Sequence, residues 1–133
     1  MTTTMTKKRI LLVDDELPVL KVTKLRLEHE GYEVVTAIDG EEALEKALSL
    51  EKNIDLILLD LKLPKLDGFR VCERLKKSPE ASKIPVIVFT ASSASWQQLT
   101  DQCVDLGIAD KIRKPFQTKD LLSKIRQAMG EEE

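Results

Sequence analysis

The sequence predicts an α/β domain, a doubly wound sheet of five parallel strands with five helices on its two faces. Short apolar runs alternate with segments of helical pattern along the whole of the 133 residues. The apolar runs are nearly continuous, which is typical of parallel strands buried on both faces. No linker or low-complexity segment marks a second domain. We therefore expect one domain over residues 7–129, with flexible tails at 1–6 and 130–133.

The first half of the chain contains three expected strands. The run RILLV at 9–13 is the first, and a helix over 17–30 follows it and stops at Gly31, a residue common just past helix ends. The apolar residues of this helix are spread around it rather than gathered on one face. The runs at 32–37 and 54–59 are the second and third strands.

The helix between the second and third strands has a cap signature. Asp39 stands before Gly40, and Glu42 follows Asp39 by three residues, which is the spacing of a capping box. The apolar residues that follow fall on one helical face: Ala43, Leu44, Ala47 and Leu48.

The second half repeats the alternation. A third helix is expected over about 68–77, and a fourth strand over 84–89. Serines within 92–95 indicate a loop before a fourth helix that ends at Gly107. The fifth strand, 108–112, is short, and the last helix takes its apolar stripe from residues at helical spacing: Leu121, Leu122, Ile125 and Met129.

Composition excludes several functional classes. The chain has 42% hydrophobic and 33% charged residues and a net charge of −2, so it has no overall basic field for direct contact with nucleic acid. Its apolar runs are too short to span a bilayer, and its first residues lack the apolar stretch of a signal peptide. We expect no membrane insertion and a cytoplasmic location. Cys72 and Cys103 lack metal-type spacing and are expected to be free thiols.

Polar residues follow the ends of four expected strands. They are Asp14, Asp15 and Glu16 after the first strand, Asp60 after the third, Thr90 after the fourth and Lys114 after the fifth. The carboxyl ends of parallel strands share one edge of the sheet, where ligands bind. With strand order 2-1-3-4-5 the first and third strands are neighbours. We therefore expect the three aspartates to lie together.

This set of residues suits phosphoryl transfer. Clustered carboxylates repel one another unless a positive charge intervenes, and oxygen ligands without His or Cys favour Mg²⁺. Lys114 and the Thr90 hydroxyl would neutralise phosphoryl oxygens, and Asp60 can act as the nucleophile. Taken singly, each residue also fits a helix cap, a turn, a strand end or a surface lysine. Their position at successive strand ends favours a shared phosphoryl-transfer site over these separate structural roles.

The motifs resemble the receiver domain of bacterial response regulators, over roughly residues 7–129. The resemblance lies in ILLVDDE at 10–16, ILLDLKLPKLDG at 57–68, VFTA at 88–91 and KPF at 114–116. It implies a flavodoxin-like fold of the type of the stand-alone chemotaxis regulators. It also implies a signalling protein in a two-component phosphorelay that supports its own phosphotransfer and autodephosphorylation but is not otherwise an enzyme.

The resemblance assigns a role to each strand-end residue. Asp60 would take a phosphoryl group from a phosphohistidine on a sensor histidine kinase or a histidine phosphotransfer protein. Thr90 and Lys114 would bind phosphoryl oxygens, and the bond from Lys114 to Pro115 would be cis.

For the metal, the resemblance implies Mg²⁺ held directly by Asp15, Asp60 and the backbone carbonyl of Lys62, with Asp14 assisting partly through water. The residues after the last helix are too few for a helix-turn-helix, so we expect output through a downstream protein target, a phosphorelay or a role as a phosphate sink. A monomer or weak homodimer is expected.

One position departs from the family pattern. The family usually has Tyr or Phe three residues before the strand-five lysine, and this chain has Lys111. A lysine does not fill an apolar slot as a ring does, so we expect activation without an inward aromatic swing. Lys111 also belongs to a basic cluster with Lys62, Lys65 and Arg113, which is either solvated surface charge or a docking surface.

Three other functions compete. A phosphatase with an Asp nucleophile would need a second Asp two residues after Asp60, where Lys62 stands. A flavin carrier would need a loop of glycine and hydroxyl residues after the first strand, where this chain has carboxylates. A phosphate-independent scaffold with the same fold is the third alternative.

Overall fold

The structure is a computed structural model that describes residues 7–49, 53–63, 65–91 and 96–130. The expectations that concern the tails at 1–6 and 131–133, Pro64 and the serines within 92–95 fall outside these ranges.

Five parallel strands form one sheet in the order β2-β1-β3-β4-β5, which confirms the predicted fold class. The strands are β1 (Arg9–Val13), β2 (Glu33–Ala37), β3 (Leu56–Asp60), β4 (Val86–Thr90) and β5 (Asp110–Arg113). The helices are α1 (Leu17–His29), α2 (Gly40–Leu48), α3 (Gly68–Lys76), α4 (Trp96–Asp105) and α5 (Thr118–Ala128), with one 3₁₀ turn at Ala81–Lys83.

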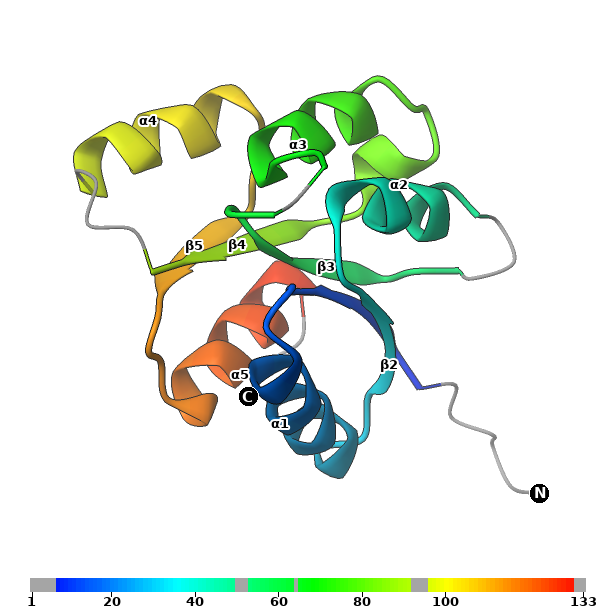
Figure 1. Ribbon diagram of the computed structural model, residues 1–133, viewed down its shortest axis with the longest axis vertical. Helices are drawn as coiled ribbons and strands as arrows, with labels where there is room; N and C mark the ends of the chain where they lie inside the picture. The colour runs from blue at the N-terminus through cyan, green and yellow to red at the C-terminus, as the bar shows by residue number, and fades with distance from the viewer. Residues whose placement is uncertain (1–6, 50–52, 64, 92–95, 131–133) are drawn as a thin grey trace.

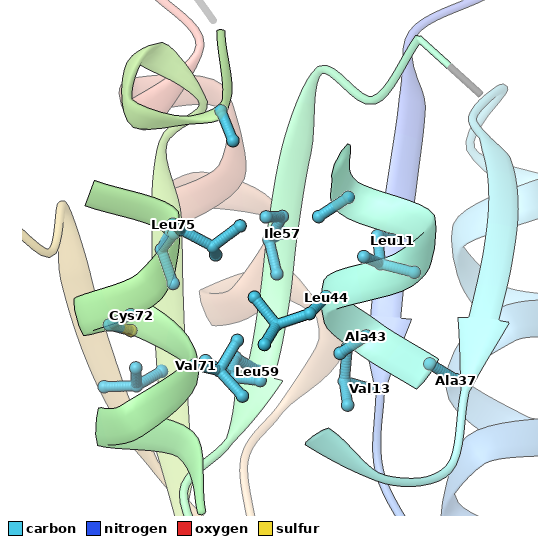
Figure 2. Close-up of a cluster of buried hydrophobic side chains, with 14 of the residues drawn as sticks. Leu11, Val13, Ala37, Ala43, Leu44, Ile57, Leu59, Val71, Cys72 and Leu75 are labelled. Atoms are coloured by element: carbon cyan, nitrogen blue, oxygen red, sulfur yellow. The ribbon is translucent and has the colours of Figure 1, made fainter. Parts of the chain in front are cut away.

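The helices cover both faces of the sheet. Helices α2, α3 and α4 lie on one face, and α1 and α5 lie on the other (Figure 1). Successive strand residues point to opposite faces, so Ile57 and Leu59 pack toward α2 and α3, as Figure 2 shows, whereas Leu56 and Leu58 join the cluster with α1 and α5. Because both faces are covered, the central strands β1, β3 and β4 are almost entirely buried and apolar, as the sequence pattern predicted, whereas the edge strands β2 and β5 carry polar and exposed residues.

Three strands, β3, β4 and β5, begin two residues later than predicted, and residues just before them make other hydrogen bonds. Ile108 donates its backbone N–H to Cys103 O at 2.9 Å, which closes the C-terminal end of α4 beyond Gly107 at φ +68°. Ile84 closes the 3₁₀ turn through a 3.0 Å bond to Ala81 O. Before β3, the Asp55 side chain accepts from Arg9 N at 2.7 Å.

The predicted N-cap of α2 is confirmed, and the Glu42 side chain returns a hydrogen bond to the residue just before the cap. Asp39 accepts from Glu42 N at 2.8 Å, and the Glu42 side chain accepts from Ile38 N at 2.8 Å. Hydrogen bonds lower the pKa of Asp39, chiefly that from the Glu42 backbone. None of the helices in the described residues has the length and apolar character needed to cross a membrane.

Candidate functional site

The expected site residues meet at the carboxyl edge of the sheet. Asp60 and Thr90 are the last residues of β3 and β4, Asp14 directly follows β1, and Lys114 directly follows β5. Strand β1 pairs with β2 on one side and with β3 on the other, so this edge is the point where the strand order reverses.

The three aspartates form a compact cluster. Asp14, Asp15 and Asp60 can each offer one carboxylate oxygen such that these oxygens lie within 4.8 Å of one another. Asp14 and Asp60 are buried, at 0% and 4% exposure, whereas Asp15 is exposed. Oxygen donors alone, in this arrangement, are the ligand chemistry that Mg²⁺ prefers, so the residues fit that ion.

Lys114 lies across this cluster and contacts three carboxylates. Its Nζ donates to Asp14 Oδ2 at 2.8 Å, to Asp60 Oδ2 at 3.1 Å and to Glu16 Oε1 at 3.2 Å. An ammonium group has three protons, so these three hydrogen bonds use all of them. Lys114 therefore supplies positive charge to the acidic cluster.

Aromatic residues support the lysine. Lys114 Nζ lies 5.0 Å from the centre of the Phe89 ring, and Phe116 meets Phe89 edge-on at 6.0 Å between centroids. Lys114 N also donates to Thr90 O at 2.8 Å, and the bond from Lys114 to Pro115 is cis, as the resemblance implied. Sequence analysis assigned no role to Glu16 or Phe89. Glu16 had two signals, its place after the first strand and inside the motif ILLVDDE, whereas Phe89 had only its place inside VFTA.

Burial and charge act in opposite directions on the site. Desolvation raises the pKa of Asp60 despite the hydrogen bonds from the Lys62 backbone and from Lys114, and the nearby Asp14 charge raises it further. Desolvation lowers the pKa of Lys114, but hydrogen bonds to Asp14 and Asp60 and their charges outweigh it, so the net pKa lies above the ordinary value. The lysine is therefore charged at neutral pH.

The loop after β3 folds back against Asp60. Lys62 N donates to Asp60 Oδ1 at 3.0 Å, and Gly68 N donates to Leu61 O at 3.0 Å. A Cβ on Gly68 would lie 2.8 Å from Asp60 O, a distance that real Cβ atoms essentially never show. Asp67 caps α3 by accepting from Arg70 N at 3.1 Å. The motif's Asp-Gly pair thus starts the helix and keeps the loop close to Asp60.

The residues of the basic cluster differ in burial, and Lys62 also belongs to the site through its backbone N–H. Lys111 is partly buried in β5, where it pairs with Val88 on the side of the sheet covered by α4. Lys62, Lys65 and Arg113 are exposed, and Lys65 lies 3.6 Å from Asp39. The activation behaviour and the docking alternative both stay predictions.

Both cysteines are free and buried, as expected, and lie in the core cluster shared by α3 and α4. Burial raises the pKa of the Cys72 thiol to about 12 and also raises that of Cys103. High pKa values keep both groups protonated and poorly nucleophilic at neutral pH.

Comparison with known protein families shows the family to which the chain belongs. The family model described as the response regulator receiver domain matches residues 10–126, which include every strand-end residue discussed above. The chain belongs to the response regulator receiver family. Receiver domains act in two-component signalling and interact with histidine kinases.

Solved receiver structures resemble the chain closely. A CheY-like receiver domain protein from Methanospirillum hungatei JF-1 is 34% identical, with a TM-score of 0.84 over 94% of this chain and 95% of that one. The receiver domain of sensor histidine kinase PA1611 from Pseudomonas aeruginosa is 28% identical, with a TM-score of 0.83 over 94% and 99%. That receiver has a magnesium ion coordinated in its active-site cleft.

Curated relatives are longer than this chain. The probable transcriptional regulator ycf27 of Cyanophora paradoxa is 44% identical over 92% of the chain and 48% of its own length. The DNA-binding regulator RpaA of Synechocystis is 38% identical over 89% of the chain and 47% of its own length. The chain therefore spans about half the length of the curated relatives that it matches.

Proposed function

We propose that this receiver domain accepts a phosphoryl group on Asp60 from a phosphohistidine and thereby switches a signalling output. The observation that carries the proposal is the position of Asp60, a buried carboxylate held by Lys114 at the carboxyl edge of the sheet. One carboxylate oxygen forms a bond to phosphorus as the bond from phosphorus to the donor imidazole breaks. The Thr90 hydroxyl and the Lys114 ammonium would then bind phosphoryl oxygens.

The proposed phosphoryl transfer uses Mg²⁺ as its cofactor. Asp15, Asp60 and the backbone carbonyl of Lys62 would bind the ion directly, with Asp14 assisting partly through water. The ion would offset the negative charge of the attacking carboxylate and of the incoming phosphoryl group. The oxygen cluster within 4.8 Å supports this assignment, as does the magnesium in the related PA1611 receiver.

The partners follow from the chemistry. The donor is a sensor histidine kinase or a histidine phosphotransfer protein, and the output is contact with a downstream protein. The cytoplasm is the proposed location, since two free cysteines suit a reducing compartment. We place the domain at 7–129, slightly wider than the matched 10–126.

Phosphorylation by a small donor tests the assignment. With Mg²⁺ and acetyl phosphate, the intact mass of the protein should rise by one phosphoryl group. The added mass should be lost on treatment with hydroxylamine, which cleaves acyl phosphates. Addition of EDTA should prevent labelling.

Two variants show whether labelling depends on Asp60. Asp60→Asn should not be labelled, whereas Asp55→Asn, which changes a carboxylate just before the opposite end of β3, should be labelled like the wild type. Equal labelling of Asp60→Asn and the wild type would refute the assignment. Steady hydrolysis of phosphate esters that depends on Asp60 would instead indicate a phosphatase.

A further inference from the structure

Of the three carboxylates shown hydrogen-bonded to Lys114 in the described part of the chain, Glu16 is the one that the proposed phosphoryl chemistry does not use. It follows the aspartate pair and directly precedes α1, and its Oε1 accepts from Lys114 Nζ at 3.2 Å. Its own backbone N–H donates to Asp14 Oδ1 at 2.9 Å, so the main chain here is held independently of the side chain.

Lys114 has no spare proton for a new acceptor. Its three hydrogen bonds go to Asp14, Asp60 and Glu16, and the ammonium group has only three protons. A phosphoryl oxygen on Asp60 can be bound by Lys114 only if one of the three present partners gives up its hydrogen bond.

The three partners differ in how much it costs to release them. The side chains of Asp14 and Asp60 are 1% and 6% exposed, whereas that of Glu16 is 60% exposed. A buried carboxylate released by Lys114 would keep only its backbone hydrogen bond, from Glu16 N to Asp14 or from Lys62 N to Asp60, and water would not replace the lost charged partner, which is costly. A released Glu16 carboxylate regains water immediately, so its release costs least.

We propose that Glu16 is a positioning residue: it occupies one proton of Lys114 before transfer and gives up this hydrogen bond to an incoming phosphoryl oxygen. This inference rests on the proposed function, because it requires Asp60 to be the acceptor. It assigns Glu16 two effects. The contact keeps one proton of Lys114 occupied, and the negative charge beside the site opposes the approach of an anionic phosphodonor.

The first test compares phosphorylation rates at saturating Mg²⁺ with acetyl phosphate as donor. Glu16→Gln keeps the side-chain shape and the backbone bond to Asp14 but removes the charge. It should be phosphorylated about two- to fivefold faster than the wild type at low ionic strength, the range expected for losing one exposed charge contact. The ratio should fall toward one near 1 M salt, because salt screens exposed charges. An effect through folding alone would not depend on salt in this way.

The second test observes the release directly. The ¹³C shift of the Glu16 carboxyl carbon is measured before and after addition of beryllofluoride, a phosphoryl mimic, with Mg²⁺. It should move toward the value of a solvated glutamate. The matched control is Glu28 in α1, which pairs with Lys24 at 3.0 Å. Its carboxyl shift should not change, and Glu28→Gln should be phosphorylated at the wild-type rate.

The outcomes separate the two claims. If the wild type is labelled but Glu16→Gln is no faster at low salt, or if the Glu16 carbon does not move with the mimic, the inference is wrong and the proposed function stands. If the wild type is not labelled at all, the proposed function fails and the inference fails with it.

Discussion

At the scale of single residues, the candidate site depends on one lysine. Lys114 is only 11% exposed and is hydrogen-bonded to two buried carboxylates. Carboxylates at this distance from each other repel, and burial removes the water that would screen them. Lys114 is therefore as much a structural residue as a phosphate-binding one.

Replacing this lysine should destabilise the fold. In Lys114→Met the buried carboxylates lose their positive partner, and we expect the free energy of unfolding to fall by about 3 kcal/mol at neutral pH. Saturating Mg²⁺ should restore part of the loss, because it supplies charge to the same oxygens. Urea unfolding with and without Mg²⁺ measures both effects.

The control for this prediction is Lys24→Met, which breaks an exposed pair with Glu28 on α1. Its cost should stay below about 0.5 kcal/mol and should not respond to Mg²⁺. Equal stability of Lys114→Met and Lys24→Met would show that the lysine does not balance the acidic cluster.

At the scale of elements, the junction of β3 and α3 links local backbone geometry to the site. Gly68 is the first residue of α3 and approaches the backbone at the end of β3, where a side chain would meet Asp60 O and Leu61 Cα, each at 2.8 Å. Glycine is required at this position because the backbone of β3 lies too close for a side chain. The φ of Gly68 is not in the left-handed region, so backbone conformation is not the reason.

A methyl group at this junction should disturb both stability and chemistry. Because the contacted atoms belong to the main chain, Gly68→Ala forces a backbone shift that we expect to cost about 1–3 kcal/mol. Displacement of Asp60 should also slow phosphorylation by acetyl phosphate severalfold. A rise of about 1 kcal/mol in the activation free energy corresponds to a rate about fivefold lower. Thermal unfolding and labelling rates would be measured together.

The comparison for that variant is Lys77→Ala, at the other end of α3. Lys77 is exposed and has a helical φ of −81°, so alanine fits there and stability should change by no more than about 0.5 kcal/mol. A Gly68→Ala protein as stable and as quickly labelled as Lys77→Ala would contradict the close-contact argument.

At the scale of the whole molecule, the fold places the reactive groups at one edge and unreactive thiols in the core. Cys72 lies in the cluster that joins the sheet to α2, α3 and α4 (Figure 2). Its pKa rises from 9.0 to about 12 because burial disfavours the thiolate. The folded state therefore holds a proton that the unfolded state releases between these two pH values.

This linkage predicts the behaviour of the molecule in alkali. Because the pKa of Cys72 is higher in the folded state, the protonated thiol contributes fully to the free energy of unfolding below pH 9. This contribution is lost as the pH rises toward about 12. In that window the thiol should lower the free energy of unfolding by up to about 1.4 kcal/mol per pH unit. Urea unfolding from pH 8 upward should show a shallower decline in Cys72→Ala than in the wild type. The same slope in both would mean that the thiol is not buried in the folded state.

The sequence by itself determined most of this protein: the α/β class, the five strands and five helices, and the strand-end residues that meet at one edge. These features could be predicted because strands buried on both faces have nearly continuous apolar sequences. Parallel strands also bring their carboxyl ends together at one edge of the sheet. The start of β5 was misjudged because Ile108 has the composition of a strand residue yet closes the end of α4.

Only the tertiary structure decided how the site is balanced. The contacts of Lys114 with Asp14 and Glu16 join residues about one hundred positions apart, and the ring of Phe89 lies beneath its ammonium group. A local pattern does not encode which exposed carboxylate completes the hydrogen bonds of a lysine. That choice depends on the distance between β1 and β5 across the folded sheet, and it distinguishes Glu16 from the other acidic residues of the surface.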